Sequence, residues 1–155
     1  MANLKPLMKS EKQDWQTPSY IFDPINEAYD FDIDSAASPD NNLLPEFWTE
    51  KDDALKQSWE DKKIWCNPPY SKAKLFIAKA LAERGNAEII ALLLPFRPDT
   101  VAFQSLNNCY VYAIKGRIKF VGGENSAPFP SCLIFLGTKF KPKNLKIPGK
   151  WILYP

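Results

Sequence analysis

A strand, an amphipathic helix and a second buried strand follow one another between residues 62 and 95, and this succession constrains the fold most. "KKIWC" (62–66) is a short apolar run bounded by turn residues, as expected of a buried strand. Apolar side chains then recur at helical spacing over residues 73–81, and "AEIIALLLP" (87–95) has no polar face. Such a unit has a right-handed crossover between parallel strands. The sequence therefore predicts the α/β class.

The flanking sequence extends this unit on both sides. A helix is expected over residues 17–28, with a kink or a division at Pro24, and a short strand over residues 31–35. A second helix follows Pro98, and three strand-like runs come after it: "YVYAIKG" (110–116), "RIKFV" (117–121) and "SCLIFLG" (131–137). We expect a compact Rossmann-like fold, with a mostly parallel sheet and a C-terminal antiparallel hairpin.

Length and composition predict one globular domain. The chain has 155 residues, of which 45% are hydrophobic and 25% charged. We expect a flexible lead-in over residues 1–13 and a single domain over residues 14–155. No apolar run approaches the ~20 residues that span a bilayer, and the first residues lack the apolar core of a signal peptide. No membrane association and a cytoplasmic location are the resulting expectations.

The absence of histidine excludes several kinds of chemistry. Acid–base catalysis and catalytic triads that use histidine are excluded, and a zinc site would lack its usual ligands. The three cysteines, Cys66, Cys109 and Cys132, are far apart and form no CxxC pair. We therefore expect no metal. The net charge is only +2, so evidence for nucleic-acid binding must come from local clusters of charge.

The first strand of the unit ends on Asn67, Pro68, Pro69 and Tyr70. Two successive prolines hold the backbone extended, and neither has an N–H group. An amide oxygen, a carbonyl beside it and an aromatic ring suit a flat molecule that carries an amino group, such as a nucleobase. Ligands of open α/β sheets bind beyond the carboxyl ends of the strands, where this tetrapeptide is expected. The alternative is an incidental turn, because Asn-Pro is a common start of a loop.

Asn-Pro-Pro-Tyr after a strand resembles the catalytic motif of DNA methyltransferases that modify amino groups. The ordered set "DWQTP", "FDIDSAAS", "DDAL", "WCNPPYSKA" and "LLLPFRPDT" resembles the phage-type DNA N6-adenine methyltransferase (Dam-like) family over residues 14–136. The resemblance implies a compact methyltransferase fold, S-adenosylmethionine as cofactor and double-stranded DNA as substrate. It also implies the cytoplasm of a bacterial host, if a phage or prophage encodes the chain.

The resemblance implies that Asn67, Pro68, Pro69 and Tyr70 are catalytic. The amide oxygen of Asn67 and the carbonyl of Pro68 can accept both hydrogens of an adenine amino group, which makes its nitrogen more nucleophilic. Tyr70 can stack on the ring. Because that nitrogen is unreachable inside a duplex, the adenine must flip out of the helix.

The resemblance also implicates the segments before and after the expected strand at residues 31–35 in cofactor binding. The residues concerned are Thr17, Pro18, Asp34, Ala36 and Ala37. In "DDAL", the carboxylate of Asp53 can accept hydrogen bonds from ribose hydroxyls or an adenine amine. The alternative for both aspartates is a helix cap or a solvated carboxylate. The stretch between Asp34 and Asn67 is short, so the sheet is either trimmed there or has very brief strands.

DNA contacts are expected from basic residues late in the chain. Lys115, Arg117 and Lys119 alternate and would project on one face of a strand, where they could follow phosphates. Arg97 and the C-terminal lysines are further candidates. The alternative is a solvated outer face. Phe129 could assist base stacking, although such a residue also packs under its own loop.

Other functions remain open on the sequence alone. Methylation of cytosine N4 uses the same acceptor geometry, although Asn67 rather than serine favours adenine. The chain could instead be an inactive nucleic-acid-binding module with this fold, or could methylate RNA or a protein amide. The sequence predicts neither the recognition site nor the oligomeric state.

Overall fold

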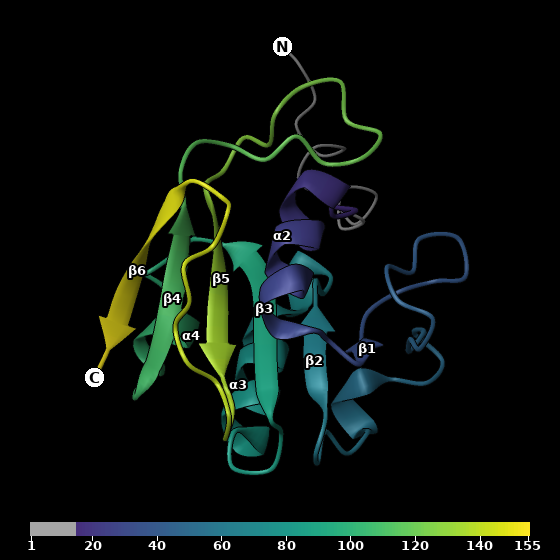
Figure 1. Cartoon of the computed structure of the whole chain (residues 1–155), viewed down its shortest axis with the longest axis vertical. Coiled ribbons are helices and arrows are strands. Elements are labelled where there is room, and N and C mark those ends of the chain that lie inside the picture. The colour runs from purple at the N-terminus through teal and green to yellow at the C-terminus, as the bar shows by residue number, and fades with distance from the viewer. Residues whose placement is uncertain (1–14) are drawn as a thin grey trace.

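One mixed sheet runs through the middle of the protein, and helices cover both of its faces (Figure 1). This computed structural model describes residues 15–155. Over these residues the strands lie in the order β1-β2-β3-β5-β4-β6. Their bounds are β1 Ile33–Asp34, β2 Lys63–Cys66, β3 Ile89–Pro95, β4 Cys109–Ile114, β5 Ser131–Leu136 and β6 Gly149–Tyr154.

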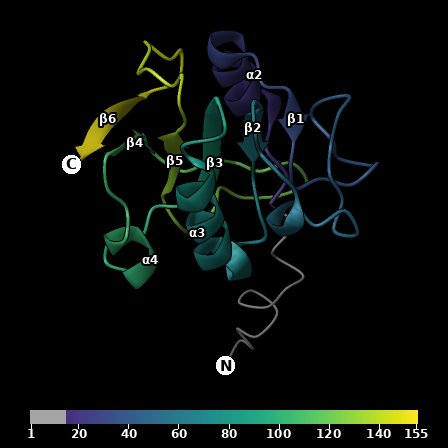
Figure 2. The same cartoon turned by 90° about the horizontal axis from the view of Figure 1, so that it is seen from below.

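The helices form two outer layers. Helix α2 (Ser19–Tyr29) covers one face of the sheet, and α3 (Ala73–Glu83) and α4 (Val101–Gln104) cover the other (Figure 2). Two short 3₁₀ helices, η2 (Ala54–Lys56) and η3 (Tyr70–Lys72), lie in the connections. The predicted helix over residues 17–28 is therefore present, and it continues through Pro24 without division.

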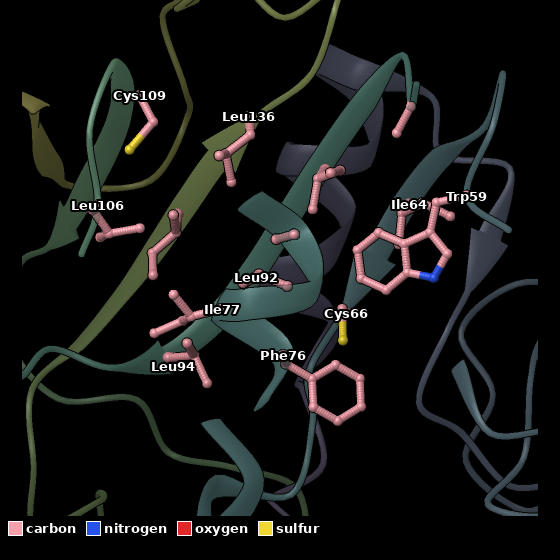
Figure 3. Packing of buried hydrophobic residues seen from close by; sticks show 14 of the residues in the cluster. Trp59, Ile64, Cys66, Phe76, Ile77, Leu92, Leu94, Leu106, Cys109 and Leu136 are labelled. Carbon is pink, nitrogen blue, oxygen red and sulfur yellow. The ribbon is translucent and has the colours of Figure 1, made fainter. Parts of the chain in front are cut away.

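Side chains of β3 alternate between two hydrophobic cores. Leu92 and Leu94 pack with Phe76 and Ile77 of α3 (Figure 3). Leu93, on the opposite face, belongs to the core beneath α2. Because β3 is buried on both faces, it needs no polar face, as its sequence predicts.

The predicted strand–helix–strand unit is confirmed. Strand β2 pairs with β3 in parallel, with Ile64 opposite Ile90, and α3 connects the two strands. Strand β1 adds to the other side of β2, also in parallel. The carboxyl ends of these three strands therefore share one edge of the sheet, and Asn67 follows directly after β2.

The expectation of a mostly parallel sheet is wrong. In the described part of the chain, two neighbouring strand pairs are parallel and three are antiparallel. Strand β5 lies between β3 and β4 and runs against both, so β3 and β4 point the same way without being neighbours. The antiparallel pairing expected near the C-terminus is present between the consecutive strands β4 and β5. Strand β6, which was not predicted, pairs antiparallel with the other side of β4.

The expected strand at residues 117–121 is also wrong. The chain is extended there without regular ladder pairing, although Ile118 and Phe120 are buried while Arg117 and Lys119 are exposed. The loop over residues 115–130 joins β4 to β5. It crosses the end of the molecule at which α2 begins (Figure 1).

The sheet is trimmed between β1 and β2. Residues 35–62 contain η2 and one isolated bridge, between Asp34 and Phe47, but no regular strand. The sequence left open whether brief strands or none would lie here, and the structure decides for none. This long loop is consequently available to line a site beside β1.

Residues 15–155 contain neither a membrane-spanning helix nor a cluster of metal ligands. None of the helices there has the length and apolar character needed to cross a membrane. Within the same residues, no three side chains of histidine, cysteine, aspartate or glutamate are grouped so that they could hold a metal ion.

The turn after β5 requires glycine, and we expect Gly137→Ala to destabilise the fold. Gly137 has φ +127°, and an added Cβ would lie 2.3 Å from the Glu88 carbonyl oxygen, which is backbone and cannot move aside. The free energy of unfolding in urea should fall by about 2–4 kcal/mol. Gly85→Ala is the matched control, because no atom lies within 4 Å of the added Cβ, and its unfolding free energy should stay within about 1 kcal/mol of wild type. Equal effects of both substitutions would contradict this account.

Candidate functional site

The amide of Asn67 is held at its nitrogen end. Its Nδ2 donates to the Trp15 carbonyl and, at 3.0 Å, to Thr17 Oγ1. A carbonyl can only accept, so the NH2 group must face Trp15. Asn67 Oδ1 is buried and has no hydrogen-bond partner among residues 15–155. Because buried polar atoms are nearly always paired, such an orphaned acceptor indicates a place for a donor that the chain itself does not supply.

Tyr70 and the two prolines lie next to Asn67 at the end of β2, and we call residues 67–70 the corner of the site. Pro68 is buried, and the Pro69 carbonyl accepts from the Lys72 backbone at 2.9 Å, which starts η3. Burial raises the pKa of the Tyr70 phenol well above its ordinary value. The Tyr70 hydroxyl, like Asn67 Oδ1, is buried without a partner in the described chain. The corner therefore contains a neutral phenol and an available amide oxygen.

A cavity of about 940 Å³ lies between Asn67 and the trimmed part of the sheet. It falls within the size range of sites that hold cofactors and small ligands. The predicted site residues that line it are Thr17, Asp34, Ala36, Ala37, Asp53, Asn67 and Pro69. Pro18, Pro68 and Tyr70 are not part of this lining. Segments predicted separately, around residues 17, 34, 53 and 67, thus meet at one site.

Asp34 presents a carboxylate to the cavity from the end of β1. The side chain is 3% exposed, and its Oδ2 accepts from the Leu43 backbone N–H at 3.0 Å. Burial raises the pKa of the Asp34 carboxyl, and the backbone N–H groups of Leu43 and Ala36 oppose that shift. No cation pairs with Asp34 in the described chain. Such a carboxylate is costly to bury, which favours a functional role over a structural one.

Asp53 reaches the same cavity from the long loop over residues 35–62, between β1 and β2. Its backbone is in the left-handed region, with φ 55°, and its Oδ1 accepts from the Leu55 N–H at 3.1 Å as the cap of η2. The predicted alternative, a helix cap, therefore applies to Asp53, yet the residue also lines the cavity. Its second oxygen lies 4.0 Å from Lys56 Nζ, an exposed pair that contributes little.

The structure separates the basic residues into paired and unpaired groups. Arg97 is exposed and forms an ion pair with Asp99 at 3.2 Å. Lys139 and Lys146 pair with glutamates, and Lys143 donates to the Ala28 carbonyl at 2.6 Å. The exposed residues of the loop after β4, Lys115, Arg117 and Lys119, form no ion pair with any other residue in the range 15–155. The same holds for the exposed side chains of Lys51, Lys72, Lys74, Lys141 and Lys150.

Phe129 is placed beside the corner rather than under its own loop alone. Its ring lies 5.6 Å from that of Tyr70, at 83°, and 5.2 Å from that of Trp15, at 88°. Phe129 therefore lies next to Tyr70, where an assisting role in base stacking, one of its two predicted roles, is sterically possible. The ring that joins them, Trp15, was not among the predicted site residues.

Sequence reasoning missed several residues of the site. Trp15 stands inside the motif "DWQTP", which was the available signal. Phe76 lines the cavity from α3, but its spacing fits the hydrophobic stripe of that helix and gives no separate signal. Thr49, Glu50 and Lys51 reach the cavity from the loop, and no pattern in the sequence marks them.

Comparison with known proteins identifies the family. A family model described as DNA N-6-adenine-methyltransferase (Dam) matches residues 5–145. The chain belongs to this family. A DNA N-6-adenine-methyltransferase of Escherichia phage T1 is 29% identical over 129 residues, which cover 71% of this chain and 54% of the phage protein. One of Haemophilus phage HP1 is 29% identical over 122 residues, which cover 75% of this chain and 70% of that protein.

The match to the T1 protein spans only about half of that relative's length. Membership of the Dam family confirms the resemblance that the ordered motifs indicated, and the family match includes every segment that lines the cavity. The two phage proteins are named for methylation of adenine N6 in DNA. For this chain the same activity is a hypothesis, which is argued below from the geometry of the site.

Proposed function

We propose that this chain methylates the N6 amino group of adenine in DNA, with S-adenosylmethionine as methyl donor and the adenine flipped out of the duplex. The observation that carries the proposal is the orphaned Oδ1 of Asn67, held beside a cavity of about 940 Å³. Asn67 Oδ1 lies at the carboxyl end of a parallel strand, where ligands of such sheets bind, and it lacks a hydrogen-bond donor. An exocyclic amine would supply that donor.

The residues around the cavity fit the proposed cofactor. S-adenosylmethionine, when bound, supplies a methyl group on a sulfonium, which is already an electrophile. Asp53 and Asp34 offer carboxylates that accept from ribose or amino groups, and Ala36 and Ala37 leave room beside them. The cavity has both polar walls and the aromatic ring of Phe76. These features suit a nucleoside-like molecule with a charged tail.

Asn67 and Tyr70 hold and activate the acceptor amine in this scheme. Because Thr17 and the Trp15 carbonyl fix the NH2 end of the amide, Asn67 Oδ1 stays oriented for the amine. Accepting its hydrogens, together with the Pro68 carbonyl, shifts electron density onto N6 and turns the lone pair out of the ring plane. Tyr70 supplies a ring on which adenine can stack, which offsets part of the cost of flipping.

Transfer of a labelled methyl group separates this function from its alternatives. The chain is incubated with S-adenosylmethionine labelled in the methyl group and with DNA, RNA or a protein mixture, and the DNA is digested to nucleosides. We expect label in N6-methyl-2′-deoxyadenosine from DNA. Label in N4-methyl-2′-deoxycytidine, in RNA or in protein would replace the proposed substrate. DNA binding without transfer would indicate the inactive module.

Asp34→Asn should weaken cofactor binding without weakening the fold. Asparagine keeps an acceptor for the Leu43 N–H but removes a charge that burial disfavours. The Kd for S-adenosylhomocysteine, by calorimetry, should rise about tenfold or more, whereas the unfolding free energy at pH 7 should stay equal or rise by about 1 kcal/mol. Unchanged affinity would remove Asp34 from the cofactor site.

The pH dependence of that comparison has a definite sign. A raised pKa in the folded state means that folding favours the protonated carboxyl, so the wild-type chain loses stability once the unfolded carboxyl ionises. The advantage of the asparagine variant should be small near pH 4, about the ordinary value for aspartate. It should grow as pH rises from there to the raised pKa and level off above it. Urea unfolding between pH 4 and pH 8 measures it.

A further inference from the structure

The ring of Trp15 stacks with that of Tyr70. The two rings are nearly parallel, at 12°, with centroids 6.5 Å apart, which lies within the range of stacked aromatic pairs. Phe129 stands edge-on to both, and Phe120 lies 5.4 Å from Trp15 on another side. Trp15 is thus enclosed by three aromatic side chains, directly beside Asn67.

The backbone of Trp15 also contacts Asn67, at the nitrogen end of its amide and not at Oδ1. Its carbonyl accepts from Asn67 Nδ2, so ring and backbone of one residue engage Tyr70 and Asn67 together. The result is a closed corner: in the described chain, Asn67 Oδ1 and the Tyr70 hydroxyl are covered from solvent and unpaired. The large cavity touches Trp15 and Asn67 but does not extend to Tyr70 or Phe129.

The loop over residues 115–130 holds Trp15 in this position. It supplies Phe120 and Phe129, and its Val121 N–H donates to the Gln16 carbonyl at 3.0 Å. The backbone N–H of Lys119 donates to the Tyr20 hydroxyl at 2.9 Å, which joins the same loop to the start of α2. The position of Trp15 is therefore held by two ring contacts and by two hydrogen bonds to the residues that follow it.

From this arrangement we propose that the indole ring of Trp15 fills the stacking position of the target base in the DNA-free protein. The ring must leave that position when the base enters, whereas the backbone carbonyl keeps its bond with Asn67. The inference rests on the proposed function, in which an adenine stacks on Tyr70 and donates to Asn67. One face of Tyr70 cannot hold two rings, so indole and adenine compete for it. Trp15 is in this sense a residue of the base site that exchanges with the substrate.

The opposite arrangement makes the opposite prediction. If Trp15 were a fixed wall of the base site, the adenine would lie between Trp15 and Tyr70, and both rings would contribute to its binding. Removing the indole would then weaken base binding. If the indole of Trp15 instead occupies the position of the base, it lowers the apparent affinity for adenine, because it must leave before adenine can bind. Removing the indole should then strengthen adenine binding.

Binding of free adenine to Trp15→Ala, without DNA or cofactor, tests the proposal. Calorimetry should show adenine binding at least about tenfold tighter than to the wild-type chain. Trp15→Phe, which keeps a smaller ring, should give an intermediate affinity. Equal or weaker binding by Trp15→Ala overturns the proposal. This result is independent of methyl transfer. If the chain methylates DNA but Trp15→Ala does not bind adenine more tightly, the proposed function stands and the role of Trp15 is wrong.

A measurement on the wild-type chain covers the case in which Trp15→Ala does not fold. With 5-fluorotryptophan incorporated, the ¹⁹F resonance of Trp15 is assigned as the one missing from Trp15→Phe. Saturating oligodeoxyadenylate, whose bases are already unpaired, should move this resonance to the position of a solvent-exposed indole. The resonance of Trp151, which packs against Phe135 on another part of the sheet, should not move. A Trp15 resonance unchanged at saturation overturns the proposal.

Discussion

Replacing Asn67 with alanine should lower kcat for DNA methylation by about 10²- to 10³-fold, the usual effect of removing one preorganised hydrogen-bonding partner of a reacting group. Alanine removes Nδ2, which donates to the Trp15 carbonyl and Thr17, and Oδ1, which is buried and unpaired in the described chain. We attribute the expected loss of kcat to Oδ1. Because that oxygen acts on the amine as its nitrogen becomes electron-poor, its contribution is greater in the transition state than in the bound ground state.

The binding of S-adenosylhomocysteine should change little in Asn67→Ala. The cavity keeps its other lining residues, including Asp34 and Asp53, and the backbone of the Asn67-Pro68-Pro69 segment is unaltered. Single-turnover rates with labelled cofactor give the chemical step, and calorimetry gives cofactor affinity. Loss of both in parallel would mean that the substitution disturbed the site as a whole, and the variant would then say nothing specific about Oδ1.

Two further variants sharpen the result. Asn67→Asp keeps an acceptor but places a carboxylate against the Trp15 carbonyl, which can only accept, so we expect activity between those of alanine and wild type. Asn144→Ala, at an exposed position outside the cavity, is the control and should be fully active. Methylation by Asn67→Ala within tenfold of wild type would contradict the proposed role of the amide.

Short-range patterns were sufficient to predict the centre of the fold. The change from an apolar run to helical spacing and back defines β2, α3 and β3, because each period comes from neighbours along the chain. Once β2 was placed, the position of Asn67 at the carboxyl edge of the sheet followed from the rule for open α/β sheets. The candidate site was therefore predictable in place, before any contact was known.

Strand order was not predictable from the same patterns. Strand β5 is buried at every position, from Ser131 to Leu136, so its sequence shows neither a face nor a direction. Nothing local requires it to enter between β3 and β4, and that pairing joins residues about 40 positions apart. Strand β6, with its mixed burial, follows a segment rich in lysine and proline and was not predicted as a strand.

The contacts among the aromatic side chains of the site were likewise not predictable from the sequence patterns. Trp15 and Phe129 stand at opposite ends of the chain, and their contact depends on how the loop over residues 115–130 folds back on the start of α2. The backbone of Asp53 in the left-handed region is likewise set by its loop and by the Leu55 N–H. Motifs identified these residues or their neighbours, whereas the contacts between them come from tertiary structure.

Removing the three unpaired cations of the loop, Lys115, Arg117 and Lys119, should weaken DNA binding about 100-fold at low salt. Each phosphate contact contributes about 0.9 to the slope of log affinity against log salt, so the slope should become shallower by about 2 to 3. The loop suits this role because it also packs on Trp15, beside the proposed base site.

A control with the same loss of charge tests whether position matters. Substituting Lys139, Lys143 and Lys146 by alanine also removes three charges, but these side chains already engage Glu88, the Ala28 carbonyl and Glu27. They lie against the end of α2 and the start of β3, away from the carboxyl edge that carries Asn67. DNA affinity measured by fluorescence anisotropy across a salt series should therefore fall far less. Equal losses in the two variants would mean that net charge alone draws the protein to DNA, and the loop would lose its assignment as the DNA-contacting surface.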